Sequence, residues 1–124
     1  MTELLLKEES YKIIGLCMEV HRQLGPGFQE AVYKDALEYE LKESNIPYVR
    51  EQGFRIPYKQ IVLERRFFAD FIVYENILLE VKATSMLVTN FTQQTLNYLK
   101  ASDLHLGLII NFGQPSLQYK RIVL

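Results

Sequence analysis

The chain has 124 residues, of which 48% are hydrophobic and 23% are charged, which excludes disorder as its main state and predicts one compact domain over residues 1–124. Fourteen Lys and Arg residues against fifteen Asp and Glu residues give a formal net charge of −1. This balance argues against a protein that holds nucleic acid by bulk positive charge. It does not exclude an enzyme that holds phosphodiesters through metal ions, because acidic metal ligands lower the net charge.

The cysteine content and the apolar runs bear on where the protein works. Cys17 is the single cysteine, so it cannot form an internal disulfide, and we expect a reducing, cytoplasmic setting. The first nine residues hold only three consecutive apolar residues before acidic ones, unlike a signal peptide. No run approaches the roughly 20 apolar residues of a membrane span, so no membrane partner is expected.

Two N-terminal segments carry apolar residues at helical spacing. The first predicts a helix from about Lys7 to Leu24, which Gly25-Pro26-Gly27 ends because proline lacks the amide hydrogen and glycine tolerates positive φ. The second predicts a helix from about Gln29 to Glu43. We expect its apolar side to include Val32, Ala36, and Tyr39 or Leu41.

The rest of the chain predicts a mixed sheet. Alternating β-branched and aromatic residues from Tyr48 to Ala83 indicate three or four antiparallel strands, with 67–74 and 77–83 as the strongest pair. A third helix is expected from Thr89 to about Ala101, with Thr89 or Asn90 as its N-cap. The apolar run from His105 to Phe112 predicts a strand buried on both faces, and Leu117 to Val123 predicts an edge strand.

The predicted order ααβββαββ specifies an α/β or α+β fold, in which helices flank a mixed β-sheet. Within the strands, charge stands where burial is expected. Alternation puts Asp70 on the strand face of Phe68 and Ile72, where a lone carboxylate would cost several kcal/mol unless it is paired or bound to metal. Glu80 and Lys82 are two residues apart and share a face of the next strand.

The hairpin register decides whether Asp70 and Glu80 can meet. They are ten residues apart, so they oppose each other only across a loop of odd length or a bulge, whereas a two-residue loop would set Asp70 against Val81. We therefore predict a three-residue turn, Tyr74-Glu75-Asn76, with Asn76 in the left-handed conformation, or else a bulge near Asp70.

Taken one by one, these charged residues also fit a solvated strand edge or a structural salt bridge. Together, two carboxylates and a lysine on neighbouring strands suit a hard divalent cation such as Mg²⁺, which the carboxylates and one main-chain carbonyl would bind. The ammonium would orient a water and face developing phosphoryl charge.

Two helical pairs complete the candidate set. Glu30 and Tyr33 lie at i,i+3 on the second helix, where a helix-start acid and a core tyrosine are the simpler explanation. Gln94 and Tyr98 lie at i,i+4 on the third helix, and a buried glutamine beside a packed tyrosine would account for them equally.

The spacing of Gly27, Glu30 and Tyr33 resembles that of the GxxExxY proteins, a prokaryotic group of the PD-(D/E)XK nuclease superfamily. The resemblance runs from about Tyr11 to Phe112 and includes the blocks 94–100 and 107–113. It implies a restriction-endonuclease-like core, with Asp70 as the aspartate of the second motif and the Glu80 and Lys82 pair as the E-X-K of the third. Ala69 departs from the wider pattern, which has a proline there.

The resemblance also implies roles for the candidate residues. Asp70, Glu80 and the main-chain carbonyl of Val81 would bind Mg²⁺ or Mn²⁺, and Glu30 would bind the metal directly or through water. Lys82 would position or help to deprotonate the attacking water, and Gln94 would orient Lys82 or the substrate. The implied activity is hydrolysis of phosphodiester bonds in DNA or RNA.

Basic residues precede this constellation and are interleaved with the aromatic residues Phe54, Tyr58 and Phe67. They could follow a nucleic acid backbone, and a solvated strand face explains them equally well. No recognition helix or long insertion is evident, so a homodimer or a protein partner could supply specificity. The alternative function is a catalytically silent module of the same fold that binds a protein or nucleic acid, and a weaker one is a non-nuclease enzyme. The basic residues are Arg50, Arg55, Lys59, Arg65 and Arg66.

Overall fold

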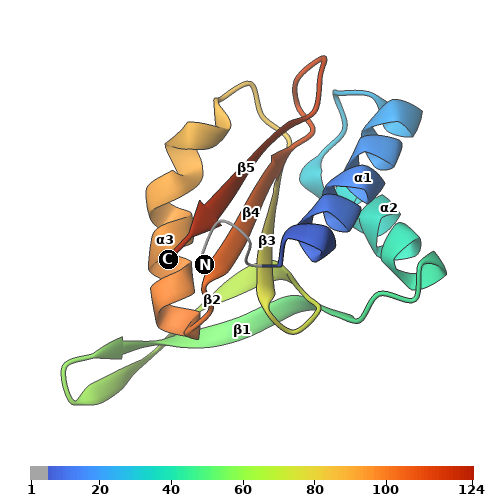
Figure 1. Ribbon diagram of the computed structural model, residues 1–124. Helices are drawn as coiled ribbons and strands as arrows, with labels where there is room; N and C mark the ends of the chain where they lie inside the picture. The colour runs from blue at the N-terminus through green and yellow to red at the C-terminus, as the bar shows by residue number, and fades with distance from the viewer. Residues whose placement is uncertain (1–5) are drawn as a thin grey trace.

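The computed structural model describes residues 6–124 and contains three α-helices and one five-stranded sheet in this part of the chain (Figure 1). The order of elements confirms the predicted fold class, an α+β domain with a mixed sheet flanked by helices. The elements are α1 (Lys7–Leu24), α2 (Glu30–Glu43), β1 (Tyr48–Tyr58), β2 (Ile61–Val73), β3 (Ile77–Lys82), the 3₁₀ helix η2 (Val88–Phe91), α3 (Thr92–Ser102), β4 (Leu106–Asn111) and β5 (Gln118–Val123).

The helices agree with the predicted positions but differ in two details. On α2 the buried residues are Tyr33, Leu37 and Leu41, which lie one turn apart. Val32 is 37% exposed, so its expected place on the apolar side was wrong, and of the two alternatives Leu41 is buried whereas Tyr39 is 62% exposed. The buried stripe of α2 therefore contains Tyr33, Leu37 and Leu41, and Val32 lies outside it.

The start of α3 is also different from the expectation. Thr89 and Asn90 belong to η2, and α3 begins at Thr92 after Phe91, which makes no side-chain cap. The expected N-cap at Thr89 or Asn90 was therefore wrong. A tighter 3₁₀ turn at a helix start, as here, satisfies backbone groups through i→i+3 bonds and needs no capping side chain.

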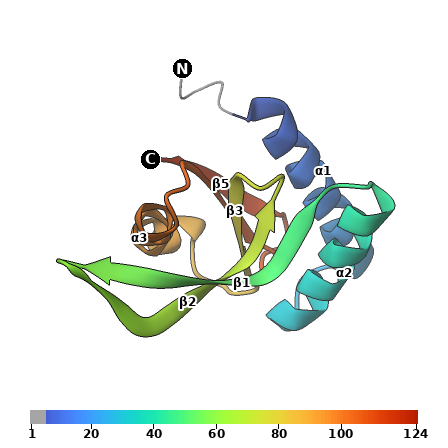
Figure 2. The ribbon, with the colours of Figure 1, turned by 90° about the horizontal axis from the view of Figure 1, so that it is seen from below.

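The strands follow the order β1-β2-β3-β4-β5 in the sheet. Only β3 and β4 run parallel among these neighbours, and the other pairs are antiparallel. All six residues of β4 are buried, and β5 lies at an edge, as predicted. The parallel pair at the centre is covered by α1 and α2 on one face and by α3 on the other (Figure 2).

The turn between β2 and β3 has the predicted length. Val73 pairs with Ile77, so Tyr74, Glu75 and Asn76 form a three-residue turn. The left-handed residues are Tyr74 (φ 55°) and Glu75 (φ 65°) instead of the expected Asn76. The Asn76 side chain donates a hydrogen bond to the Tyr74 carbonyl (3.2 Å), so it supports the turn from outside the left-handed positions.

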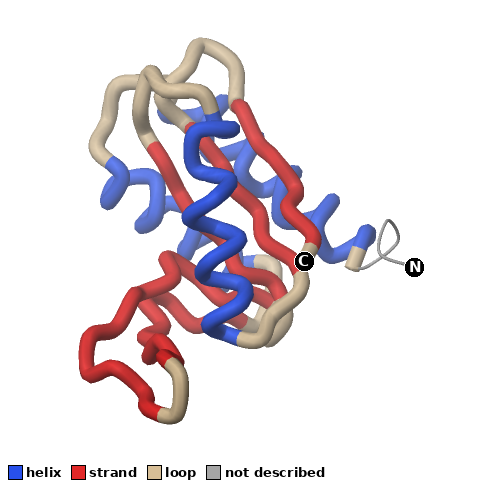
Figure 3. The backbone as a smooth tube through the Cα atoms, turned by 90° about the vertical axis from the view of Figure 1, so that its left-hand side faces the viewer, coloured by secondary structure: helices blue, strands red, loops and turns tan. Residues whose placement is uncertain are grey.

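The long β1–β2 ribbon changes direction at Glu51 and Asp70. Its register runs from Arg50–Phe71 to Gln52–Ala69 and omits these two residues, and Glu51 has a φ of 57°. Beyond this kink, Gln52–Tyr58 and Ile61–Ala69 form a ribbon that extends past the sheet, which we call the arm (Figure 3).

The kink overturns one expectation about strand faces. Ala69 and Ile72 both pack in the core on the α3 side, whereas Phe71 packs on the α1 and α2 side. Simple alternation therefore fails at Asp70. Phe68 is 55% exposed and points away from Ala69, whereas Ile72 is buried on the same side as Ala69. Phe68 and Ile72 therefore lie on opposite faces, and Asp70 cannot share a face with both.

Candidate functional site

Asp70 and Glu80 form an interlocked pair at the point where β2 leaves β3. Phe71–Leu79 is the last backbone pair of the β2–β3 ladder. The next residues, Asp70 on β2 and Glu80 on β3, are therefore joined by side-chain hydrogen bonds instead. The Glu80 carboxylate Oε2 accepts a hydrogen bond from the Asp70 amide (3.1 Å), and Asp70 Oδ2 accepts one from the Val81 amide (2.7 Å). The odd-length turn thus brings together the two acids that sequence reasoning paired.

The environment of Glu80 makes its charge costly. Glu80 is only 4% exposed. Burial is the main cause that raises the pKa of Glu80 to about 7, and the charge of Asp70 raises it further. The hydrogen bond from the Asp70 amide and the charges of Lys82 and Lys34 act in the opposite direction. A further positive charge at this place would favour the ionised form of Glu80.

Lys82 lies on the α3 side of the sheet. Its Nζ stands 4.7 Å from the centre of the Phe91 ring, a cation–π contact with the end of η2. Tyr98 on α3 stacks on Phe67 at 4.1 Å between ring centres. Burial raises the pKa of Tyr98, and the charges of Glu80 and Asp70 add to the effect.

Sequence reasoning missed Lys34. Its ammonium bonds Asp70 Oδ1 (3.0 Å) and also pairs with Glu51, and its side chain is 12% exposed. Burial lowers the pKa of Lys34, but the bonds and charges of Glu51 and Asp70 outweigh it, so the pKa is raised. Lys34 lies one helical turn after Glu30 and so shares its face, a spacing that could have suggested it.

Among residues 6–124, no hydrogen bond or ion pair joins Glu30 or Gln94 to Asp70 or Glu80. Glu30 is exposed on the first turn of α2, and Gln94 is exposed near the start of α3. Within residues 6–124 no group of three or more His, Cys, Asp or Glu side chains is placed to share a metal ion. Helical spacing predicts which face of its helix Glu30 or Gln94 occupies, but it does not predict how far that face lies from the strands.

Gly27 and Tyr33 have structural roles at the turn between α1 and α2. Gly27 has a φ of 113°, which only glycine adopts without strain. The Tyr33 hydroxyl donates to the Gly25 carbonyl (2.5 Å) and accepts from the Phe28 amide (3.2 Å), and its ring stacks on Phe112 at 4.6 Å. These contacts hold the turn between α1 and α2 and thereby the start of the helix that carries Lys34.

Asn111 fixes the loop that follows Lys82. Its buried amide oxygen accepts from the amides of Thr84 (3.0 Å) and Gly113 (2.9 Å). Its Nδ2 donates to the carbonyls of Thr84 (2.9 Å) and Met86 (3.1 Å). A Cβ on Gly113 would lie 2.3 Å from the Thr84 nitrogen, so only glycine permits this approach. The loop therefore leaves β3 in a fixed direction toward η2.

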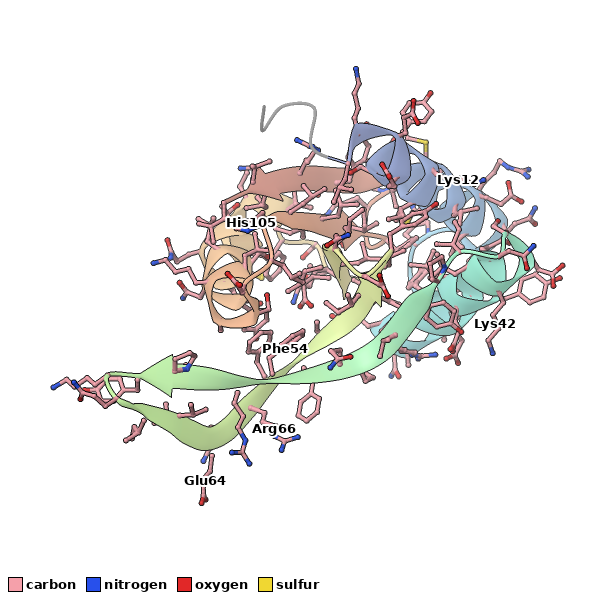
Figure 4. The ribbon with its side chains drawn as sticks, turned by 60° about the horizontal axis from the view of Figure 1, so that its bottom comes forward. Lys12, Lys42, Phe54, Glu64, Arg66 and His105 are labelled. Atoms are coloured by element: carbon pink, nitrogen blue, oxygen red, sulfur yellow. The ribbon has the colours of Figure 1, made fainter. Side chains whose placement is uncertain are left out.

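The basic residues divide into two groups. Arg50 pairs with Asp35 and Glu38, both at 2.8 Å, and so ties β1 to α2. The remaining basic residues of the group are exposed on the arm. Phe54 stacks on Phe67 at 5.2 Å and turns with it toward α3, as Figure 4 shows for Phe54.

Comparisons with known proteins identify the family and the fold. The family model described as PD-(D/E)XK nuclease superfamily matches residues 7–122. The crystal structure of SSO0001 is similar in fold, with a TM-score of 0.59 and 19% sequence identity over 75% of this chain. The matched part is 48% of that protein, so the chain spans about half its length. No curated protein matches the sequence. None of the helices in the described residues is long and apolar enough to cross a membrane.

Proposed function

Because the chain belongs to the PD-(D/E)XK nuclease superfamily, we propose that it hydrolyses phosphodiester bonds of DNA or RNA with the help of Mg²⁺ or Mn²⁺. Within the superfamily we place it in the GxxExxY group, on Gly27, Glu30 and Tyr33. The observation that carries the proposal is the interlocked pair of Asp70 and Glu80, with Lys82 two residues further along β3.

The residues present fit a hard divalent cation. Asp70 and Glu80 supply carboxylate oxygens, and the raised pKa of Glu80 is the expected property of a buried acid that awaits a cation. The Lys82 carbonyl accepts from the Phe112 amide (2.8 Å) across β4, so the neighbouring Val81 carbonyl faces the other way, toward the Asp70 side. Two carboxylates and one carbonyl suit Mg²⁺, which keeps several waters.

In this proposal each residue acts on the substrate or on the attacking water. A bound metal ion would supply charge neutralisation and a more acidic water. Asp70 and Glu80 hold that ion, while Lys82 holds the attacking water and faces the charge that develops on phosphorus. Glu30, which is exposed, contributes through water, and Gln94 orients the substrate from α3.

The proposal is tested by cleavage of single-stranded, double-stranded and branched DNA and of RNA in Mg²⁺ or Mn²⁺. Asp70→Asn and Lys82→Met should each lower the rate at least about 100-fold, because each removes charge that the transition state needs. Asp103→Asn and Lys12→Met, at exposed positions, are the matched controls and should cleave like wild type. Cleavage that survives both site substitutions would identify a contaminating nuclease.

Metal binding is tested separately by calorimetric titration with Mn²⁺. Glu80→Gln should abolish the binding heat, because a neutral amide is a poor ligand for a hard cation. Glu64→Gln on the exposed arm should bind as wild type does. Indistinguishable titrations of wild type and Glu80→Gln would contradict the metal site.

One observation favours a second candidate function, a catalytically silent binding module. The Lys34 ammonium already neutralises Asp70, so the pair is partly satisfied without a metal ion. This candidate predicts no heat of Mn²⁺ binding and no cleavage in wild type, together with retained binding of a nucleic acid or protein partner.

A further inference from the structure

The arm presents two different faces. Its inner face carries Phe54 and Phe67, which stack on each other, and Phe67 also stacks on Tyr98 of α3. Its outer face, which we define by Gly53 and Arg55 on β1 and Arg66 and Phe68 on β2, is not covered by any described element. Figure 4 shows Arg66 projecting from the arm on the side away from α3.

Two arginines oppose each other on this outer face. Arg55 and Arg66 are direct cross-strand partners, an arrangement that destabilises a sheet because like charges face each other. Both are exposed, and among residues 6–124 neither forms an ion pair. A pair of guanidinium groups held side by side without an acid is a site for an anion, and phosphate suits their fork geometry.

An exposed aromatic ring lies beside the arginines. Phe68 is 55% exposed and pairs with Gly53. A Cβ added to Gly53 would lie 3.0 Å from Phe68 Cε1, so the ring covers the glycine backbone. The ring is thus supported from below and open to solvent above, which is the arrangement of a platform on which a base can stack.

This surface leads directly to the candidate site. Along β2 the order is Arg66, Phe68, Asp70 at two-residue steps. At about 3.4 Å per residue, the ring lies about 7 Å and the arginine about 14 Å along the strand from Asp70. The longer distance corresponds to about four stacked nucleotides, at about 3.4 Å each.

We propose that the outer face of the arm binds an unpaired strand of nucleic acid, with a base stacked on Phe68 and phosphates held by Arg55 and Arg66. The inference rests on the proposed nuclease function and adds a substrate class to it, single-stranded or locally unpaired nucleic acid. A duplex keeps its bases stacked on each other, so only an unpaired strand can use the phenyl ring.

Binding is measured by fluorescence anisotropy with full-length protein in EDTA, so that no cleavage occurs. The probes are a labelled single strand of about 12 nucleotides, within the range of known site sizes, and the duplex of the same sequence. We expect tighter binding of the single strand. Phe68→Ala should weaken it about tenfold, and Phe68→Tyr should restore it.

The arginines are tested by salt dependence. In the double variant R55Q/R66Q, the slope of log K against log salt concentration should fall by about 1.4, the value for two lost phosphate contacts on a single strand. The double variant K12Q/K42Q removes two exposed lysines from α1 and α2 and should leave the slope unchanged. Thermal unfolding checks the fold, and loss of the repulsion should leave the arginine variant at least as stable as wild type.

Several outcomes would overturn the proposal. These are no binding by wild type, equal binding of duplex and single strand, or arm variants that bind like wild type. A change of oligomeric state in the arm variants, seen by sedimentation, would show that the surface contacts protein. If wild type binds the single strand through the arm but never cleaves it, the nuclease proposal fails and the arm proposal stands. If wild type cleaves and the arm variants bind and cleave as it does, the arm proposal fails and the nuclease proposal stands.

Discussion

β2 is one strand with two surroundings. From Phe71 to Val73 every side chain is buried between helices, whereas from Ile61 to Arg66 nearly every side chain is exposed. Asp70 lies between these halves, where the ladders with β1 and β3 are both interrupted. The difference shows how one strand can serve the proposed site, because the buried half fixes the acids and the exposed half leaves an approach open.

The largest effect should come from the buried half of this comparison. Leu79 is fully buried and pairs with Phe71 and Leu108, so Leu79→Ala should lower the free energy of unfolding by about 3 to 5 kcal/mol. Val62 on the arm is 54% exposed, and Val62→Ala should change it by less than about 0.5 kcal/mol. Urea unfolding measures both, and similar losses would show that the arm is part of the core.

The next largest effect on the free energy of unfolding is expected at Glu80. Its pKa is raised from 4.5 to about 7, so the native state binds the proton more tightly than the unfolded chain does. Its contribution to stability is therefore fully present below pH 4.5 and is lost as the pH rises through 7. In EDTA at pH 8, Glu80→Gln should be more stable than wild type by about 3 kcal/mol.

Unfolding by urea at several pH values checks this sign. The advantage of Glu80→Gln should shrink as the pH falls from 7 to 4.5. Glu64→Gln, on the exposed arm, should show no such trend. A variant less stable than wild type at pH 8 would show that the carboxylate is stabilised by its neighbours.

A smaller loss is expected at Tyr33. Tyr33→Phe keeps the ring on Phe112 but removes the hydroxyl that joins the Gly25 carbonyl to the Phe28 amide. The free energy of unfolding should fall by about 1 to 2 kcal/mol. Tyr39 on the same helix is 62% exposed, so Tyr39→Phe is the control and should be neutral by thermal unfolding.

The smallest effect concerns metal affinity. Lys34 places a positive charge on Asp70, so Lys34→Gln should tighten Mn²⁺ binding about fivefold, equivalent to about 1 kcal/mol. Calorimetric titration measures the change, with Lys42→Gln on the same helix as the control. Weaker binding in Lys34→Gln would mean that the lysine organises the acids for the metal.

Sequence reasoning predicted the part of the site that depends on local rules. Alternation and the ten-residue separation of Asp70 and Glu80 predicted a three-residue turn or else a bulge near Asp70, and the structure has the three-residue turn. The run from His105 to Phe112 likewise predicted the buried strand β4. These features follow from residues that are close in the chain.

The rest depended on distant segments. Lys34 pairs with Glu51 and Asp70 only because α2 packs beside the kink, and no local pattern encodes that docking. Asp70 was expected to share one face with Phe68 and Ile72, and this was wrong because the kink breaks the alternation on which the expectation depended. Val32, and Tyr39 as one of two alternatives, were expected on the buried side of α2. Two stripes of this helix carry apolar residues, and only packing against distant segments decides which stripe is buried.

The amide of Asn111 has a consequence for motion. Because one buried side chain bonds Thr84, Met86 and Gly113, the loop after β3 can open only when β4 itself opens. Hydrogen exchange of the Thr84 amide should therefore be as slow as that of the central strands, although it lies outside any ladder.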